Sequence, residues 1–376
     1  MQLVAYGAQD IYLTGNPQIT FFKVVYRRHT NFSMEAIEQT WNGTSSGTTA
    51  SRCTATVSRN GDLVHRLYLE IDGTPRAEAN PSAQGITDIE IEIGGQKIDK
   101  HTGQWMNVWS HLTESNPSGH VGEIDNATFT GTLFQNMSGM GGALGDTDGA
   151  AKLFVPLQFW FCRNPGLALP LIALQYHEVK VVLNHDWTQG FSALTSNKLW
   201  ADYIYLDTDE RRRFAQVSHE YLIEQVQEGT VTAAASSELN FNHPVKELVF
   251  CVDASDGTLA TIGSSAATYQ LKLNGHDRFA ARDWRYFSRT QVWEHHSGAG
   301  GLTAAGESDG AFSDGIGVYS FALKPEEHQP SGTCNFSRID NAQFVQTTNA
   351  TATKVYAVNY NVLRIMSGMG GLAYSN

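Results

Sequence analysis

The feature that most constrains the fold of this sequence is a strand–turn–strand pattern that occurs twice, about 180 residues apart. In the first copy, 91–98, two glycines separate alternating apolar residues, and in the second, 271–279, the central pair is Asn-Gly. Both turns suit a positive φ, and Asn-Gly between alternating apolar residues is a strong hairpin signal. The repetition predicts two copies of one β-rich unit.

Three further pairs of segments repeat in the same chain order. They are 63–72 with 244–253, 159–161 before Pro170 with 319–321 before Pro330, and 201–206 with 357–362. Ordered pairs separated by loops of changing length are what an internal duplication leaves behind. The alternative is chance, because any all-β chain repeats alternating patterns.

The chain of 376 residues is long enough for two domains, and no segment has the pattern of a long amphipathic helix. We therefore expect an all-β fold of two tandem eight-stranded jelly-roll β-sandwich domains, with short helices in the linker and loops. The predicted division is an N-terminal arm at 1–18, a first jelly roll at 19–208, a linker helix at 209–217 and a second jelly roll at 218–376.

Particular segments carry more specific predictions. Residues 19–27 are rich in β-branched and aromatic side chains and predict the first core strand, and 152–161 and 173–183 predict two later ones. Thr208 precedes an acidic and then basic run, which predicts a helix at 209–216. The longest interruption, 99–151, includes a predicted helix at 101–112, and we expect it to form an outward or intersubunit surface.

The composition argues against several functional classes. The formal net charge is −12, so we expect no direct contact with nucleic acid, and the short arginine clusters at 27–28 and 211–213 are interpreted as solvated or interface charges. No secretory leader or membrane-spanning run is visible, which predicts cytosolic synthesis and no transmembrane segment. The four cysteines lack metal-ligand spacing, and Cys162 and Cys251 are predicted to be buried thiols.

Several short patterns suggest chemistry, but each has a simpler interpretation. The G-x-S-x-G pattern at 43–47 lies in a polar loop between strands, not on a strand-to-helix elbow. The acidic run at 207–210 fits a helix start better than a calcium loop, and His295-His296 lacks a third ligand. The glycine-rich runs at 137–142 and 366–371 are interpreted as flexible turns. We therefore predict no catalytic, cofactor-binding or metal-binding residues.

Six N-x-S/T sequons offer possible sites for N-linked glycans. Without a secretory signal most should stay unmodified. Asn126 and Asn136 lie in the long loop and are predicted to be the most accessible. The other four are Asn31, Asn42, Asn335 and Asn349.

Long runs across nearly the whole chain match a known pattern, namely 7–10, 12–23, 26–32, 91–96, 165–179, 329–338 and 359–366. Together these runs resemble the major capsid proteins of nucleocytoplasmic large eukaryotic DNA viruses, and among them the algal-virus, chlorella-virus-like branch.

The resemblance implies a double jelly roll that forms a homotrimer, and a pseudo-hexagonal capsomer that tiles an icosahedral shell. The implied partners are further copies of the chain, neighbouring capsomers and minor capsid proteins, in a virion assembled in the cytoplasm of the infected host cell. Three alternatives stay open: a minor capsid paralogue, which the short loops of the second domain favour, a carbohydrate-binding jelly roll, and a cupin-type enzyme. The last would need a His/Glu metal set, which we do not find.

Overall fold

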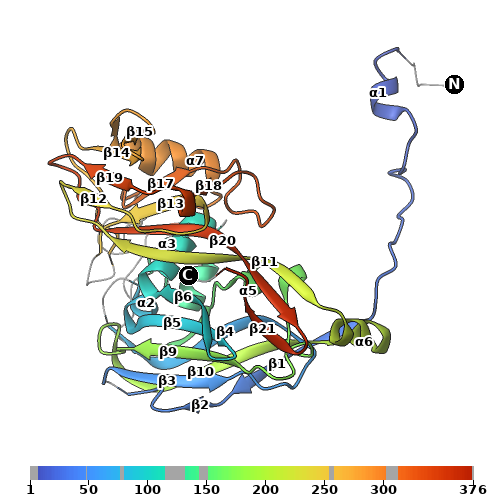
Figure 1. Ribbon diagram of the computed structural model, residues 1–376. Helices are drawn as coiled ribbons and strands as arrows, with labels where there is room; N and C mark the ends of the chain where they lie inside the picture. The colour runs from blue at the N-terminus through green and yellow to red at the C-terminus, as the bar shows by residue number, and fades with distance from the viewer. Residues whose placement is uncertain are drawn as a thin grey trace.

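A computed structural model of the chain describes residues 7–47, 49–76, 80–114, 132–143, 151–253, 258–301 and 312–374. Two β-sandwiches are stacked on one another, and an extended N-terminal arm leaves the lower one (Figure 1). Within the described residues, no helix is both long enough and apolar enough to span a bilayer.

The first half of the chain forms two antiparallel sheets that face each other. One has the order β1 (Phe32–Gln39), β10 (Phe191–Leu206), β4 (Leu63–Pro75) and β7 (Ala151–Pro156), with β8 (Leu169–Pro170) beside β4. The other has the order β2 (Trp41–Asn42), β3 (Ser51–Thr56), β9 (Val179–His185), β5 (Ile86–Ile93) and β6 (Gln96–Thr102).

The second half repeats this arrangement. One sheet has the order β11 (His219–Thr230), β20 (Lys354–Met366), β13 (Pro244–Cys251) and β17 (Ile316–Ser320), with β18 (Cys334–Asn335) beside β13 and β21 (Met369–Leu372) beside β20. The other has the order β12 (Ser236–Glu238), β19 (Ala342–Gln346), β14 (Thr268–Leu273) and β15 (His276–Asp277), with β16 (Arg282–Asp283) beside β14.

The strand register confirms the internal duplication. Leu67 and Leu248 are partners in the sequence repeat, and Ala201 and Ala357 stand opposite them in the two sheets. Both repeated hairpins also form, β5–β6 and β14–β15, each around residues with positive φ. The predicted all-β fold of two tandem jelly rolls is confirmed, although short additional strands raise the number above the expected eight in each half. The third repeat is less regular, because 159–161 runs into helix α5 whereas 319–321 covers the end of strand β17.

The helices are short, as predicted. The two anticipated from sequence are α3 (Gly103–Thr113) and α6 (Thr208–Gln216). Asp207 occupies the N-cap position of α6, one residue earlier than expected, and its side chain makes no capping hydrogen bond. The others are α1 (Ile11–Thr14), α2 (Pro81–Gly85), α4 (Leu133–Ser138), α5 (Trp160–Arg163) and α7 (Gln291–His295), with short turns η1 (Pro165–Leu167), η2 (Tyr286–Thr290) and η3 (Phe336–Arg338).

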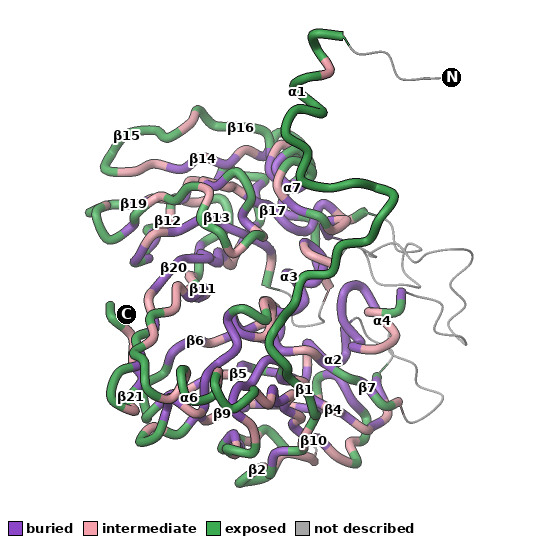
Figure 2. Tube along the Cα trace, turned by 90° about the vertical axis from the view of Figure 1, so that its right-hand side faces the viewer, coloured by how far each residue is buried: buried purple, intermediate pink, exposed green. Residues whose placement is uncertain are grey.

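The predicted first core strand at 19–27 is wrong. These residues extend away from the body (Figure 1) and are exposed (Figure 2), and the first strand that the structure describes begins at Phe32. A strand needs a neighbouring strand to satisfy its backbone, and this segment has none among the described residues. Two other strand limits also differ, since β7 ends at Pro156 and β9 begins only at Val179.

A pair of adjacent glycines tests how tightly the β5–β6 hairpin is packed. Gly94 and Gly95 both have positive φ, but a Cβ on Gly94 would lie 2.3 Å from Nδ1 of His177, whereas Gly95 faces open space. We expect Gly95→Ala to cost about 1 kcal/mol through backbone strain. Gly94→Ala should cost roughly 1–3 kcal/mol more through overpacking. Urea denaturation measures both, and equal losses would contradict the close packing of His177.

Candidate assembly interface

The two jelly rolls are joined by helix α3, which comes from the first half of the chain and packs against the second. Trp105, Trp109 and neighbouring apolar residues of α3 form one cluster with side chains of β13, β17 and β20. The ring centroid of Trp105 lies 5.0 Å from that of Tyr356. On another side of the helix, Met106 joins the core of the first jelly roll. The helix therefore contacts the core of the first jelly roll on one side and the outer face of a sheet of the second on the other, and it lies between the two bodies (Figure 1).

Local sequence explains why α3 forms and where it ends. The hydroxyl of Thr102 accepts a hydrogen bond from the backbone N–H of Trp105 and caps the first turn. Nine of its eleven residues are buried, the pattern of a helix enclosed on several sides. At the other end, N–H groups of Gly298 and Gly300 donate to the carbonyls of Leu112 and His111. The second half thus satisfies the helix's last carbonyl groups.

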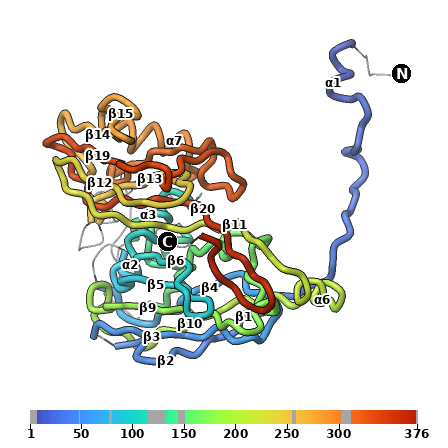
Figure 3. Tube along the Cα trace, viewed as in Figure 1, coloured from blue at the N-terminus to red at the C-terminus, as the bar shows by residue number. Residues whose placement is uncertain are grey.

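The C-terminal hairpin forms a second connection. Strand β20 runs from the upper body to the lower one, where the chain turns and returns as β21 (Figure 3). There Leu363 and Ile365 enter the core of the first jelly roll, and the imidazole of His177 lies 2.9 Å from the carbonyl oxygen of Gly370. The end of the chain therefore clamps the two jelly rolls together.

Buried charges also cross the seam, which is the contact between the two jelly rolls formed by α3 and the C-terminal hairpin. Glu224 on β11 is buried and pairs with Arg163 of α5 at 3.0 Å and with Lys246 of β13 at 2.8 Å. His328 lies 3.5 Å from the same carboxylate. Burial alone would raise the pKa of Glu224, but Arg163, His328 and Lys246 outweigh it and lower the pKa to about 2. The carboxylate is therefore ionised at neutral pH, and one of its partners comes from the other jelly roll.

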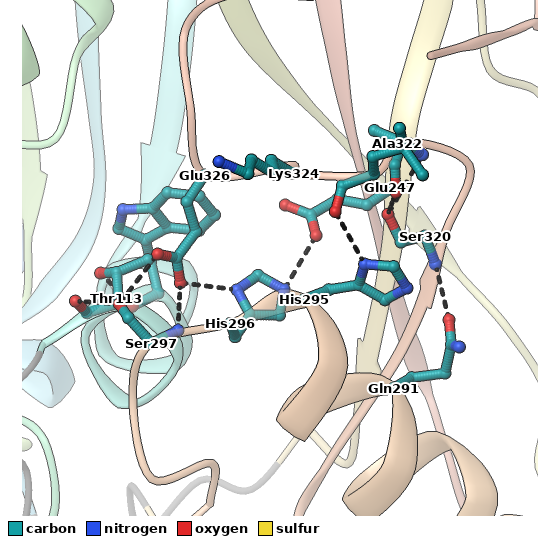
Figure 4. A network of polar contacts seen from close by, with 12 residues as sticks. Thr113, Glu247, Gln291, His295, His296, Ser297, Ser320, Ala322, Lys324 and Glu326 are labelled. Atoms are coloured by element: carbon teal, nitrogen blue, oxygen red, sulfur yellow. Dashed lines mark hydrogen bonds and ion pairs between the residues drawn. The ribbon is translucent and has the colours of Figure 1, made fainter. Parts of the chain in front are cut away.

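A second buried group centres on His296 (Figure 4). Its Nε2 lies 2.9 Å from Glu247 and its Nδ1 lies 3.0 Å from Glu326. The hydroxyl of Ser297 is within hydrogen-bond distance of Glu326 and of the backbone carbonyl of Thr113, at the end of α3. Burial favours the neutral imidazole, but the two carboxylates outweigh it and raise the pKa of His296 to about 9. This imidazolium helps to anchor α3.

Sequence reasoning considered His296 only as a metal ligand and missed Glu224, Lys246 and Glu247, although a signal was present. Lys246 and Glu247 interrupt an apolar strand, and Glu224 directly follows Leu222 and Ile223 in β11. Charged residues at such positions are rarely buried unless they are paired. Their partners could not be read from the sequence, because Arg163 and His328 lie far away along the chain.

The other sequence patterns fall on ordinary structural positions. The run 43–47 lies in the loop between β2 and β3, where the hydroxyl of Ser45 donates to the carbonyl of Asn197. The acidic run at 207–210 begins α6, and His295 lies 3.2 Å from the carbonyl oxygen of Leu323. Within the described residues, no group of three or more His, Cys, Asp or Glu side chains is arranged to hold a metal. All four cysteines are free, with Cys251 buried and Cys162 half-buried.

The sequons differ in exposure from the prediction. Asn136 is half-buried in α4, and its side-chain nitrogen donates to the carbonyl of Thr132. Asn126 lies outside the described residues. The four remaining sequon asparagines are exposed: Asn31, Asn42, Asn335 and Asn349. Glycosylation at Asn126 and Asn136 stays a prediction.

The long interruption is also placed differently from the prediction. We expected 99–151 to form an outward or intersubunit surface, but α3 lies inside the seam and α4 packs against β7 of its own chain. Even the polar Asn107, Ser110 and His111 of α3 are buried, so this part of the interruption does not face solvent. The loop residues 115–131 and 144–150 lie outside the described part of the chain.

A tryptophan pair tests the seam. Trp105 is 1% exposed, so Trp105→Ala should cost roughly 3–5 kcal/mol of unfolding free energy through the cavity it leaves. Trp293 on α7 is 84% exposed, and Trp293→Ala should change stability by no more than about 0.5 kcal/mol. Thermal or denaturant unfolding measures both. Similar losses for the two variants would show that α3 does not join the cores.

The His296 group predicts a pH dependence. Because its pKa is raised from 6.5 to about 9, its stabilisation is complete below pH 6.5 and is lost as the pH rises through about 9. The full effect is roughly 3 kcal/mol. His296→Gln should be less stable than the natural chain at pH 7, with the difference shrinking by pH 10. His276→Gln, at an exposed position, is the control. A difference that is constant between pH 6 and pH 10 would contradict the assignment.

Comparison with known proteins gives one consistent result. A family model described as "Major capsid protein N-terminus" matches residues 20–207, and one described as "Large eukaryotic DNA virus major capsid protein" matches residues 210–371. The major capsid protein of Pyramimonas orientalis virus is 53% identical, and that of Paramecium bursaria Chlorella virus 1 is 39% identical. Each comparison covers 100% of this chain and 99% of the relative.

Solved structures agree with the sequence relatives. The crystal structure of PBCV-1 VP54 matches with a TM-score of 0.76 and 36% identity, over 95% of this chain and 100% of that one. The Faustovirus major capsid protein, at 13% identity and a TM-score of 0.70 over 96% of this chain and 94% of that one, shares the fold. Two family models that together match nearly the whole chain, and relatives similar over its full length, confirm the resemblance seen in the sequence. The chain belongs to the family of major capsid proteins of large eukaryotic DNA viruses.

Proposed function

We propose that three copies of this chain form a capsomer with threefold symmetry and a six-sided outline, and that such capsomers tile the icosahedral shell of a large DNA virus. The observation that carries the proposal is the internal duplication. Two jelly rolls with the same strand order lie in one chain, so a threefold ring of chains presents six similar sides. Six similar sides allow hexagonal packing.

A six-sided capsomer also needs its two jelly rolls to keep a fixed relation. Here α3, the C-terminal hairpin and the buried charges around Glu224 and His296 hold them together. Domains joined through so much apolar surface move as one body, whereas a small polar contact would allow hinge motion. The seam therefore supports the proposed outline.

The remaining parts of the proposal concern boundaries and partners. We propose an arm to residue 31, a first jelly roll from Phe32, a linker at α6 and a second jelly roll from β11. We also propose that neighbouring capsomers and minor capsid proteins contact the rim, that assembly takes place in the host cytoplasm, and that the role requires no catalysis, metal or cofactor. The net charge of −12 supports a shell that does not bind the genome directly.

The chain is proposed to be the major capsid protein, and the alternative within the family is a minor capsid paralogue. The full-length similarity to proteins named major capsid protein favours the major role. The same similarity favours a capsid protein over a carbohydrate-binding module.

The oligomer is tested directly on purified protein. Size-exclusion chromatography with light scattering should give a mass about three times the chain's 41.3 kDa. Electron micrographs should show six-sided particles with threefold symmetry. A single-chain mass at high concentration, or particles with a twofold axis, would refute the proposal.

A further inference from the structure

The N-terminal arm has a composition that a free segment rarely has. Its described residues, 7–31, are all exposed except the partly covered Asp10 (Figure 2). Between 19 and 26 it carries six large apolar side chains, and Phe22 is 97% exposed. Contiguous apolar surface of this kind marks a protein interaction site. The six are Ile19, Phe21, Phe22, Val24, Val25 and Tyr26.

The backbone of this segment is as unsatisfied as its side chains. Within the described residues, every hydrogen bond made by 7–31 stays inside the arm, and between 19 and 26 the N–H of Phe22 bonds to the hydroxyl of Thr20. The β-branched and aromatic residues favour a strand. A strand-forming segment without a neighbour is an incomplete sheet element.

Strand β1 offers the complementary incomplete element. It ends its sheet and, among the described residues, pairs with β10 alone, so its other edge is open. Phe32 and Met34 on this strand are exposed. Natural edge strands are usually protected by charged side chains, proline or a bulge. Strand β1 has no lysine, proline or bulge, and its only charges are Glu35 and Glu38, which a basic partner strand would neutralise. An open edge of eight residues is a template for an added strand.

The charges of the two elements are opposite. The arm to residue 31 holds Lys23, Arg27 and Arg28 against one acidic residue, Asp10, and the chain as a whole carries −12. Strand β1 contains Glu35 and Glu38 and no basic residue. Glu38 pairs with Lys198, while Glu35 accepts a hydrogen bond from Tyr205 and has no basic partner among the described residues. The arm and the edge therefore attract each other.

We propose that residues 19–26 of one copy add as a strand to the free edge of β1 in the next copy, so that three arms and three edges close a ring. This inference rests on the proposed trimer. The two segments have equal lengths of eight residues. Residues 27–31 connect the added strand to β1 of the same chain and span about 17 Å when extended, so the contact requires the β1 edge of the next copy to lie near the start of this chain's β1. A heterologous contact of this kind closes into a ring when the rotation between copies is threefold.

A lipid surface is the less suitable partner. The segment is apolar, but an isolated strand would bring unpaired backbone groups into the membrane, where each costs several kcal/mol. Lys23 also interrupts its apolar run. Pairing with β1 satisfies the backbone, covers the apolar side chains and places the basic residues near Glu35.

Cross-linking between different chains tests the pairing. Full overlap places Phe22 opposite Ala36 in an antiparallel arrangement and one residue from it in a parallel one. One chain carries Phe22→Cys, a co-expressed chain carries Ala36→Cys, and the purified trimer is treated with a short thiol cross-linker. We expect a product of two chains from the mixture and none from either variant alone. Replacing Ala36→Cys by Asp277→Cys, an exposed site on β15, should abolish it.

A chain that carries both cysteines distinguishes pairing of the arm with another copy from pairing of the arm with β1 of its own chain. If Phe22→Cys and Ala36→Cys in one chain cross-link within that chain at dilution, the arm pairs with its own β1 and the inference is wrong. Absence of any cross-link in a confirmed trimer refutes it as well, while leaving the proposed function intact. A chain that stays monomeric refutes both.

Removal of the contact gives the energetic test. Deleting residues 1–26 should raise the concentration at which the trimer dissociates by at least about tenfold. Phe22→Ser with Val24→Ser should do the same without shortening the chain, and Leu13→Ser, outside the proposed strand, is the matched control. Unchanged dissociation would overturn the inference. So would flotation of the natural trimer, but not of the truncated one, with anionic vesicles when no cross-link forms.

Discussion

The burial of α3 between the two jelly rolls is the interaction on which the rest of this architecture depends. A helix inserted between the sixth and seventh strands of the first jelly roll covers the outer face of a sheet in the second. That sheet is consequently buried on both faces, which is unusual for an antiparallel sheet. Two sandwiches that each had one solvated face would separate easily, whereas here the first core includes Leu363 and Ile365 of the second half, and α3 covers the outer face of a sheet in the second jelly roll.

Charged residues in the same seam have a different role from the apolar ones. Burying Glu224, Lys246 and His296 costs desolvation energy, and a well-packed apolar seam could have been at least as stable. Paired charges, however, are satisfied in one arrangement only, since a displaced partner leaves a buried charge without compensation. The apolar contacts thus hold the jelly rolls together, and the charges select a single relative orientation. For a shell built from repeated units, a unique orientation matters more than extra stability.

In contrast to the seam, the arm and the edge strand β1 leave their interacting groups uncovered. Both leave hydrogen-bonding groups and apolar side chains exposed, which a protein that acts alone would avoid because such surfaces promote aggregation. In a chain that functions only in an assembly, the same surfaces become specific contacts. The acidic body and the basic arm bias these contacts toward copies of the same chain.

The duplication, the jelly-roll class, the two hairpins and the helices at α3 and α6 could all be predicted from local patterns, because alternation, turn residues and capping act over a few neighbouring positions. The position of α3, the pairing of Glu224 with Arg163 and the clamp made by β21 could not. They join residues that are distant in sequence, and a local pattern contains no information about which distant surface covers an apolar face. The segment 19–27 shows that a local pattern also does not decide whether a predicted strand forms. Its residues favour a strand, but whether a strand forms depends on pairing with a sheet edge, and the described residues place no strand beside the arm along its observed path.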